Sequence, residues 1–356
     1  MTASEDASYL AALHAAWDQY GDQRRVTDII EVSPHVSTNR VYRVSLDDGS
    51  AVISKFSSYG SYFLFREDHD RINRWKRLLY PTRYRSFLAD SLTVEERVYT
   101  FYDGSMWAAF YQEVERRTTL PRILTDIQVD CFGTEMALFH LECARLAPKI
   151  PLTATSIKSD AIHLLEQVSE KHSAQKFSLD AAELDVVRRH THAFLVELER
   201  ISYDYWQKIP VLIDWNLGNF SVDMQPDGRF KLFSRWDYDW FRMEPRLLDF
   251  YFLSRVSSRT GDRTHFTYSP HTLVEPRFIR FLQAYHTTYP FTEAELRFLK
   301  ECYRFFILNY VIREGDHFFV EDLWRRLQIE AVHGYLPAVD TLDMDPVVEA
   351  VLGADR

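Results

Sequence analysis

A strand-patterned island, residues 211–239, interrupts the mainly helical sequence that follows Thr118. The apolar run Val211–Ile213 opens the island, and a second strand-like run, Phe230–Trp236, comes near its end. The segment Gln225–Gly228, which reads Gln-Pro-Asp-Gly, is a strong turn signal between them. The turn is predicted to fold the second run back beside the first. A fold for this chain must therefore place a β-hairpin inside a helical domain.

Three side chains that carry oxygen ligands lie at the ends of these runs. Asp214 follows the first run directly, Asn219 comes five residues later, and Asp237 ends the second run. Magnesium prefers oxygen ligands and usually takes one or two carboxylates together with phosphate oxygens and water. Each residue alone is typical of a loop or turn. The combination, with Asp249 twelve residues on, indicates a phosphotransferase site, since that chemistry needs mainly positioning and charge.

The first part of the chain has the pattern of an antiparallel sheet. Asp47-Asp48-Gly49-Ser50 between two alternating runs predicts a tight hairpin. Strands are expected over residues 26–32, 40–46, 51–56, 94–101 and 106–114, and helices over 8–20 and 62–79. The predicted fold class is α+β. It has a small lobe of residues 1–113, a larger mainly helical lobe of residues 114–356, and a connector near 112–118.

Helical signals dominate the larger lobe. Phe132, Met136, Phe139 and Cys143 form one apolar stripe, on which His140 is interpreted as a satisfied core histidine. His190 and His192 lie on another predicted helix and are expected to be surface residues. Two capping-box spacings mark helix starts, Asp180 with Glu183 and Thr292 with Glu295.

Composition excludes several classes of protein. Only 11 of 356 residues are glycine, so a glycine-rich phosphate cradle is not expected. A formal net charge of -10 argues against a general nucleic-acid binder. The chain has no apolar run long enough to span a membrane and no signal peptide, and it is expected to be cytoplasmic. Three widely spaced cysteines suggest neither a disulfide framework nor a zinc site.

The order of the motifs permits a family comparison. Asp214-Trp-Asn-Leu-Gly-Asn219 resembles the Asp-x-x-x-Gly-Asn core of the aminoglycoside phosphotransferase and choline kinase family, and Asp237-Tyr-Asp239 resembles its metal-binding motif. Residues 37–44 are similar to the nucleotide-positioning hairpin of that family, 52–55 to its lysine-bearing strand, and 132–140 to the helix that opens the larger lobe. The similarity spans residues 25–310 in the right order.

The resemblance implies a two-lobed protein-kinase-like fold that binds ATP or GTP, with magnesium, in a cleft. Asp214 would be the catalytic base, and Asn219 and Asp237 would hold the metal. The residues implied in nucleotide binding are Lys55 for the phosphates, Glu67 as the partner of that lysine, Ser37, Thr38 and Asn39 in the hairpin, and Gln112 and Val114 at the hinge. Asp249 would buttress the catalytic loop.

Some assignments remain open on sequence alone. Asp68 and Asp70 compete with Glu67 as the partner of Lys55, and Glu67 is also spaced to form a surface pair with Arg71. The family often has His-Gly directly before the catalytic aspartate, whereas this chain has Leu212-Ile213. The family has small aliphatic residues before the metal-binding aspartate, whereas this chain has Arg235-Trp236.

The leading hypothesis is therefore a kinase that phosphorylates a hydroxyl of a small molecule, such as an aminoglycoside, amino alcohol, sugar or homoserine-like acceptor. A pseudokinase that binds nucleotide without transfer is the alternative that Leu212 supports. A third reading takes Asp237-Tyr-Asp239 as the Asp-x-Asp motif of a nucleotide-sugar glycosyltransferase. The acceptor pocket is expected within residues 145–200 and 255–335, and Ser254–Pro276 is expected to be a solvated connector or a loop over the cleft. The sequence does not predict the oligomeric state.

Overall fold

The computed structural model describes residues 3–33, 39–58, 60–262 and 266–353. The chain divides into two compact units. The first runs from the N-terminus to Glu115 and includes His317–Val320, and the second contains the remainder. The predicted lobes meet within two residues of this boundary. The hinge role of residues 112–118 stays a prediction.

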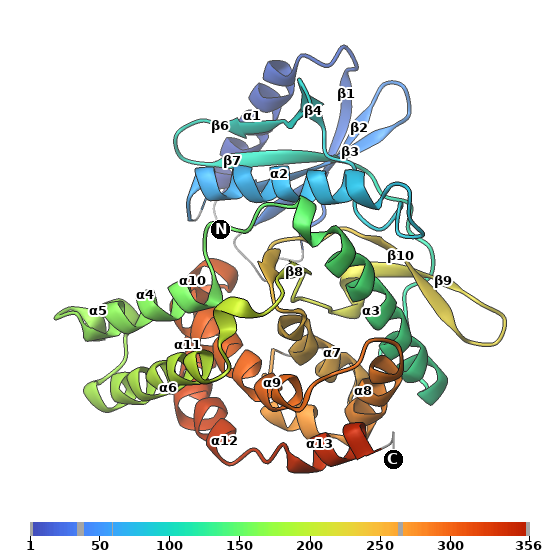
Figure 1. Cartoon of the computed structure of the whole chain (residues 1–356). Helices are drawn as coiled ribbons and strands as arrows, with labels where there is room; N and C mark the ends of the chain where they lie inside the picture. The colour runs from blue at the N-terminus through green and yellow to red at the C-terminus, as the bar shows by residue number, and fades with distance from the viewer. Residues whose placement is uncertain (1–2, 34–38, 59, 263–265, 354–356) are drawn as a thin grey trace. The chain divides into compact units, whose positions relative to one another are not determined.

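A five-stranded antiparallel sheet, in the order β1-β2-β3-β7-β6, forms the centre of the first unit (Figure 1). Its strands are β1 (Val26–Glu31), β2 (Arg40–Leu46), β3 (Ala51–Ser57), β7 (Trp107–Gln112) and β6 (Thr100–Tyr102). The expected hairpin joins β2 to β3, and Gly49 adopts the positive φ of +82° that this turn requires. The predicted antiparallel sheet is confirmed.

Helices α1 (Ala3–Tyr20) and α2 (Tyr62–Leu79) accompany this sheet. The apolar side of α1, with Leu13 and Trp17, packs into one core with Val44, Phe56 and Phe110 of the sheet. Burial of these side chains holds the helix to the strands.

The single strand predicted over residues 94–101 is wrong. Glu95 and Glu96 both have positive φ, at 49° and 69°, which reverses the chain between β4 (Thr93–Val94) and β5 (Arg97–Val98). Two positive φ values are typical of a two-residue hairpin turn, but glutamate is not a residue that signals one.

The second unit is mainly helical and contains two short antiparallel sheets. The turn at Gln225–Gly228 joins β9 (Phe220–Met224) to β10 (Phe230–Arg235). The predicted pairing of Phe230–Trp236 with Val211–Ile213 is therefore wrong, because a four-residue turn pairs the strands on either side of it. Instead β8 (Ile209–Val211) pairs with β11 (Arg242–Glu244).

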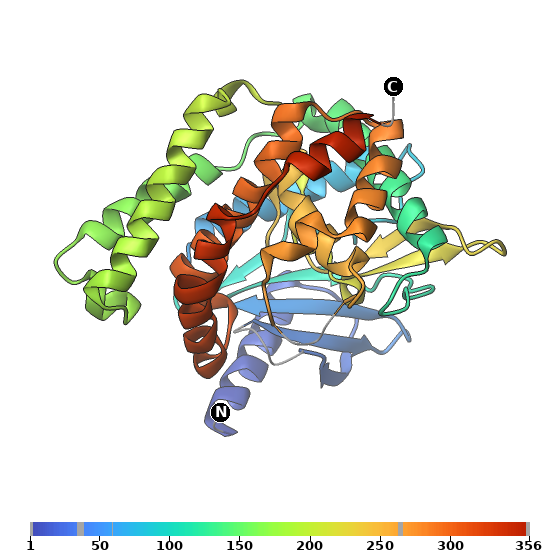
Figure 2. The ribbon, with the colours of Figure 1, turned by 90° about the horizontal axis from the view of Figure 1, so that it is seen from below.

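Both predicted capping boxes are confirmed in this unit. Asp180 caps α6 (Ala181–Arg200), and Thr292 caps α9 (Glu293–Phe306). α4 (Ile157–Ser169) packs against α6 (Figure 2). The longer remaining helices are α3 (Asp126–Leu146), α7 (Phe250–Ser257), α8 (Pro276–Thr288), α11 (Glu321–Glu330) and α13 (Asp345–Leu352). Shorter ones are α5 (Ser173–Phe177) and α12 (Leu336–Asp340), while α10 (Gly315–Phe318) begins in this unit and ends in the segment assigned to the first. No helix of the described ranges is long and apolar enough to cross a membrane.

Helices α3 and α8 cross at Gly133. A Cβ atom at this position would lie 2.4 Å from the carbonyl oxygen of Phe281 and 3.0 Å from the Cβ of Ala284. The close approach of the two backbones therefore depends on the missing side chain. The apolar stripe of α3, with Phe132, Met136, Phe139 and Cys143, is buried as predicted.

We expect Gly133→Ala to force α3 and α8 apart and to lower the free energy of unfolding by about 1–3 kcal/mol, the usual cost of overpacking. Gly334→Ala is the matched control, because a Cβ at Gly334 meets no atom within 4 Å. Chemical denaturation of both variants measures the difference. Equal stability of the two variants would contradict the packing argument.

Candidate active site

The loop that carries Asp214 begins with a strained residue. Ile213, directly before Asp214, has φ of +61°, a left-handed conformation that β-branched side chains rarely adopt. Glycine is the usual residue for this conformation, which gives a physical reason for glycine at the corresponding place in the family motif. The strain persists only if surrounding contacts fix the backbone.

Asp249 supplies those contacts. Its Oδ1 accepts hydrogen bonds from the backbone N–H groups of Leu212, at 3.0 Å, and Ile213, at 2.6 Å. Its Oδ2 lies 2.9 Å from Nε2 of His140. The carboxylate is completely buried, and its three hydrogen bonds compensate for the lost hydration. The Asp249 side chain, at the start of α7, thus fixes the backbone of Leu212 and Ile213, the two residues directly before Asp214.

His140 and Tyr285 extend this network. Nδ1 of His140 lies 2.8 Å from the hydroxyl of Tyr285. Burial lowers the pKa of His140, so the ring is neutral. A neutral ring donates through one nitrogen only, and the Asp249 carboxylate requires that donor to be Nε2. Nδ1 then accepts from Tyr285. His140 is a satisfied core histidine, as predicted, but its partner is the residue that holds the catalytic loop.

Arg235 connects the two acidic residues of the site. Its guanidinium donates through Nε to the backbone oxygen of Asp237, at 2.7 Å, and through Nη2 to the backbone oxygen of Asp214, at 2.6 Å. The side chain is 1% exposed and lies over the ring of Trp215. Sequence reasoning noted Arg235 only as a departure from the family pattern. No spacing signal reveals that a strand-end arginine points inward to bind backbone carbonyls.

The β9–β10 hairpin brings Asn219 beside the end of β10, which leads to Asp237. Its register sets Phe220 opposite Arg235, and the backbone oxygen of Asn219 accepts a hydrogen bond from Trp236 at 3.2 Å. The Asn219 side-chain amide donates to the backbone oxygen of Asp214 at 3.4 Å. The donating nitrogen therefore points toward the loop, and the side-chain oxygen is the atom left to act as a ligand.

Asp214 has the electrostatics of a proton acceptor. Burial and, next, the negative charge of Asp237 raise the pKa of Asp214 to about 6. The backbone N–H of Asn216 donates to its Oδ1 at 3.1 Å, which fixes the orientation of the carboxyl group. A carboxylate with a pKa near the working pH is suited to general base catalysis.

Asn219 and Asp237 form a donor set that fits magnesium. Both offer oxygen, and Asp237 Oδ1 also accepts the N–H of Asp239 at 3.1 Å. Within the part of the chain that the structure describes, no three His, Cys, Asp or Glu side chains gather as a metal cluster. Such a cluster is the pattern of zinc or calcium sites, whereas magnesium bound with a nucleotide needs only one or two protein oxygens.

Lys55 lies on β3, the central strand of the first unit, between Val41 of β2 and Ala109 of β7. Its charge contributes to lowering the pKa of His69, on α2, to about 4, although burial is the larger cause.

Glu67, the predicted partner of Lys55, forms an ion pair with Arg71 at 3.1 Å, the surface pairing that the sequence left open. Asp68 also binds Arg71, at 2.9 Å, and Asp70 accepts the backbone N–H of Val98. The role of Glu67 toward Lys55 stays a prediction.

The other predicted nucleotide contacts are backbone or hairpin groups. Ser37 and Thr38 lie outside the described residues, and Asn39 is buried at the start of β2. The N–H of Gln112, the last residue of β7, donates to Asp90 at 2.8 Å, and Val114 follows the end of the strand. Hydrogen bonds to the purine of a nucleotide would therefore use the backbone carbonyl of Gln112 or the backbone groups of Val114.

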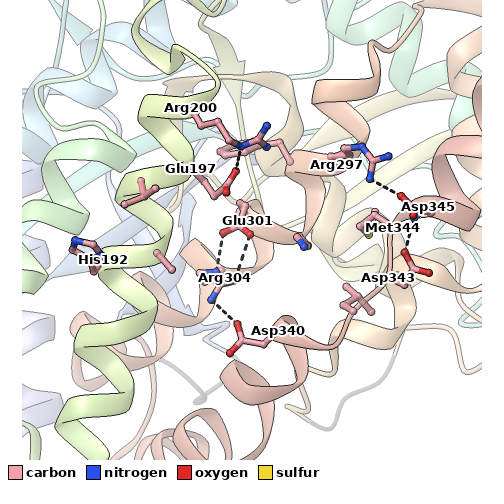
Figure 3. A pocket seen from close by; sticks show the side chains of 15 residues that line it. His192, Glu197, Arg200, Arg297, Glu301, Arg304, Asp340, Asp343, Met344 and Asp345 are labelled. Carbon is pink, nitrogen blue, oxygen red and sulfur yellow. Dashed lines mark hydrogen bonds and ion pairs between the residues drawn. The ribbon is translucent and has the colours of Figure 1, made fainter.

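A cavity of about 720 Å³ between α6, α9 and the chain that leads into α13 lies apart from these residues (Figure 3). Its walls carry their own ion pairs: Arg200 with Glu197, Arg297 with Asp345, and Arg304 with Glu301 and Asp340. The prediction that His190 is a surface residue is wrong. His190 is fully buried behind this wall, where it contacts Arg304, while His192 is exposed as predicted.

Comparison with known proteins agrees with this geometry at the level of fold. No family model and no curated protein matches the chain. Solved structures do match over most of its length. A microcompartment-associated aminopropanol kinase has a TM-score of 0.61 at 13% identity, covering 92% of this chain and 96% of that one. The chain has the kinase-like fold of small-molecule phosphotransferases.

Two further structures have the same fold. The GDP and kanamycin complex of the aminoglycoside phosphotransferase APH(2")-IIIa has a TM-score of 0.59 at 12% identity, covering 94% of this chain and 98% of that one. An amicoumacin kinase in complex with AMP-PNP, Ca²⁺ and Ami has a TM-score of 0.57 at 14% identity, covering 89% of this chain and 90% of that one. Because these two proteins bind different small molecules, the fold alone does not identify a substrate.

The Asp249 network yields a stability prediction. Asp249→Ala removes the acceptor of two buried N–H groups and of His140, so we expect a loss of about 2–5 kcal/mol in the free energy of unfolding. We also expect any catalytic activity of the folded fraction to fall by at least tenfold, because Ile213 is no longer held.

Asp160→Ala is the matched control. Asp160 is equally buried and binds Arg242 at 2.5 Å and Arg313 at 2.7 Å, away from the catalytic loop. Its loss should lower stability but spare the activity per folded molecule. Unfolding curves and activity normalised to folded protein separate the two effects. A normal rate in Asp249→Ala would show that Asp249 does not position the loop.

Proposed function

We propose that this protein transfers the γ-phosphate of ATP or GTP to a hydroxyl group of a small molecule. The observation that carries the proposal is the convergence of Asp214, Asn219 and Asp237, from three points of the sequence, around one half-buried loop whose backbone is bound by Asp249 and Arg235. The kinase-like fold supports it, since structures with this fold include nucleotide complexes and antibiotic kinases.

Each residue has a definite role in this proposal. Asp214 orients the acceptor hydroxyl and takes its proton, while Asn219 and Asp237 hold magnesium. The metal would neutralise negative charge on the phosphates as the bond to the leaving oxygen breaks. Lys55 binds the α- and β-phosphates as a point charge. Arg235 keeps the carbonyl groups of Asp214 and Asp237 at fixed positions, so that neither acidic side chain moves away from the other.

The replacement of the family histidine by Leu212 is compatible with catalysis. Leu212 is completely buried, and its N–H group is held by Asp249. The backbone hydrogen bonds and the Asn216 contact orient Asp214 without a side chain at position 212. A pseudokinase would not need a carboxyl group with a pKa near 6 at this point.

We expect Asp214→Ala to reduce phosphate transfer by about 10²–10⁴-fold, the usual contribution of a positioned base, while nucleotide affinity changes little. Asp237→Ala should instead abolish the magnesium dependence of nucleotide binding. Nucleotide turnover across a panel of hydroxylated metabolites and antibiotics, with calorimetric nucleotide binding, measures both effects. Full activity in Asp214→Ala would refute the role of base, and magnesium-dependent binding without transfer to any acceptor would indicate a pseudokinase.

A further inference from the structure

The segment that follows α7 is more ordered than the sequence suggests. Ser254–Pro276 was expected to be a solvated connector or a loop over the cleft, yet Ser257 and Ser258 are buried. Helix α7 continues to Ser257, and a short 3₁₀ helix covers Pro270–Val274. Between these two helices the chain contacts the loop that carries Asp214.

The contact is a hydrogen bond from the backbone N–H of Leu217 to the carboxylate of Asp262. The nitrogen of Leu217 lies 2.7 Å from Oδ2 of Asp262, 45 residues further along the chain. Leu217 is buried and begins the 3₁₀ helix η3 (Leu217–Asn219), where the preceding residue provides no side-chain cap. An N–H group at the start of a helix has no partner within that helix, and leaving it buried and unpaired is costly. Asp262 supplies the acceptor.

The carboxylate of Asp262 is committed to this bond. Among the residues that the structure describes, Leu217 gives the only hydrogen bond to the side chain of Asp262, which forms no ion pair. Asp262 is half-buried, and burial raises its pKa, while the hydrogen bond from Leu217 and the charge of Arg255 act in the opposite direction. The carboxylate therefore loses hydration and recovers part of that loss from the loop.

The backbone of Asp262 is held by another part of the same unit. Its N–H donates to the carbonyl oxygen of Arg122 at 2.9 Å. Gly261 packs against the same carbonyl, because a Cβ atom at Gly261 would lie 2.1 Å from that oxygen, and it has φ of +65°. Only glycine suits both this space and this conformation. Asp262 is thus presented to the loop from a fixed backbone.

Asp262 holds the part of the loop that Asp249 does not reach. Asp249 binds the two residues directly before Asp214, whereas Asp262 binds Leu217, two residues before Asn219. Across the loop, the Asn219 amide donates to the backbone oxygen of Asp214 at 3.4 Å, which is longer than a typical hydrogen bond. That bond alone holds the amide weakly. The direction of the Asn219 side chain therefore depends on the turn that the Leu217 contact fixes.

We propose that Asp262 is a positioning residue for the magnesium ligand Asn219. By binding the N–H of Leu217, it fixes the 3₁₀ turn from which the Asn219 side chain projects, so that the side-chain oxygen stays available to the metal. The inference rests on the proposed function, in which Asn219 and Asp237 hold magnesium. It divides two tasks, since Asp249 holds the residues before the base and Asp262 holds those before a metal ligand.

The test measures nucleotide affinity by calorimetry with and without magnesium, for ATP and for GTP. In the parent protein, magnesium should strengthen nucleotide binding. Asp262→Ala should lower this gain about tenfold, because groups that hold a metal ligand in place typically contribute about 10–100-fold to metal affinity. Asp262→Asn keeps an oxygen acceptor in the same place and should retain the gain. Asp262→Glu keeps the charge but moves the carboxylate by one methylene group, and should lower the gain.

Glu275→Ala is the matched control. Glu275 is half-buried in the same segment, and its carboxylate accepts the backbone N–H of Arg259 at 3.0 Å, away from the loop. Its loss should leave the magnesium gain unchanged. A second measurement needs no ligand. Hydrogen exchange at the Leu217 amide, followed by NMR, should be about tenfold faster in Asp262→Ala than in the parent or in Glu275→Ala.

Several outcomes would overturn the inference. These are an unchanged magnesium gain in Asp262→Ala, an equal loss in Asp262→Asn, a similar loss in Glu275→Ala, and unchanged exchange at the Leu217 amide. If the parent shows a magnesium gain, each of these refutes the positioning role and leaves the proposed function standing. A parent that binds no nucleotide, or binds it without a magnesium gain, refutes the metal role of Asn219 in the proposed function, and the inference fails with it.

Discussion

The buried carboxylate of Asp249 is the contact on which the site depends. It accepts the backbone N–H groups of Leu212 and Ile213, and these hydrogen bonds hold Ile213 at its positive φ. Strain of this kind costs on the order of 1–3 kcal/mol and must be offset by the surrounding structure. His140 and Tyr285 fix the carboxylate in turn. The orientation of Asp214 is therefore a property of the packed core and not of the loop alone.

A second constraint is the proximity of like charges. Arg235 donates to the backbone oxygens of both Asp214 and Asp237, which holds the two residues near each other. Burial and, next, the negative charge of Asp237 raise the pKa of Asp214 to about 6. The site thus concentrates negative charge, which a bound cation would balance.

The sequence predicted those features that depend on local chemistry. The hairpin at Gly49, the capping boxes at Asp180 and Thr292 and the apolar stripe of α3 follow from turn, cap and periodicity rules, and the structure confirms each of them. The triad of Asp214, Asn219 and Asp237 was predicted from its spacing, and the hairpin register brings Asn219 beside the strand that leads to Asp237.

The features that sequence reasoning missed depend on contacts between distant residues. Nothing local shows that Phe230–Arg235 pairs with Phe220–Met224, that His140 faces Asp249, or that His190 is buried. Arg235 is an ordinary charged residue in the sequence. In the structure its guanidinium lies over the ring of Trp215 and binds two backbone oxygens, one of them distant along the chain.

The central claim is that the fold holds Asp214 half-buried beside Asp237, ready to accept a proton. A carbon-13 NMR titration of the aspartate carboxyl groups tests it most directly, with the Asp214 signal assigned by its absence from Asp214→Asn. The account predicts a pKa near 6 in the parent protein, and a lower value in Asp237→Asn, because removal of the neighbouring negative charge makes ionisation easier. A pKa near 3.8, the ordinary value for aspartate, that is the same in both proteins would contradict the account.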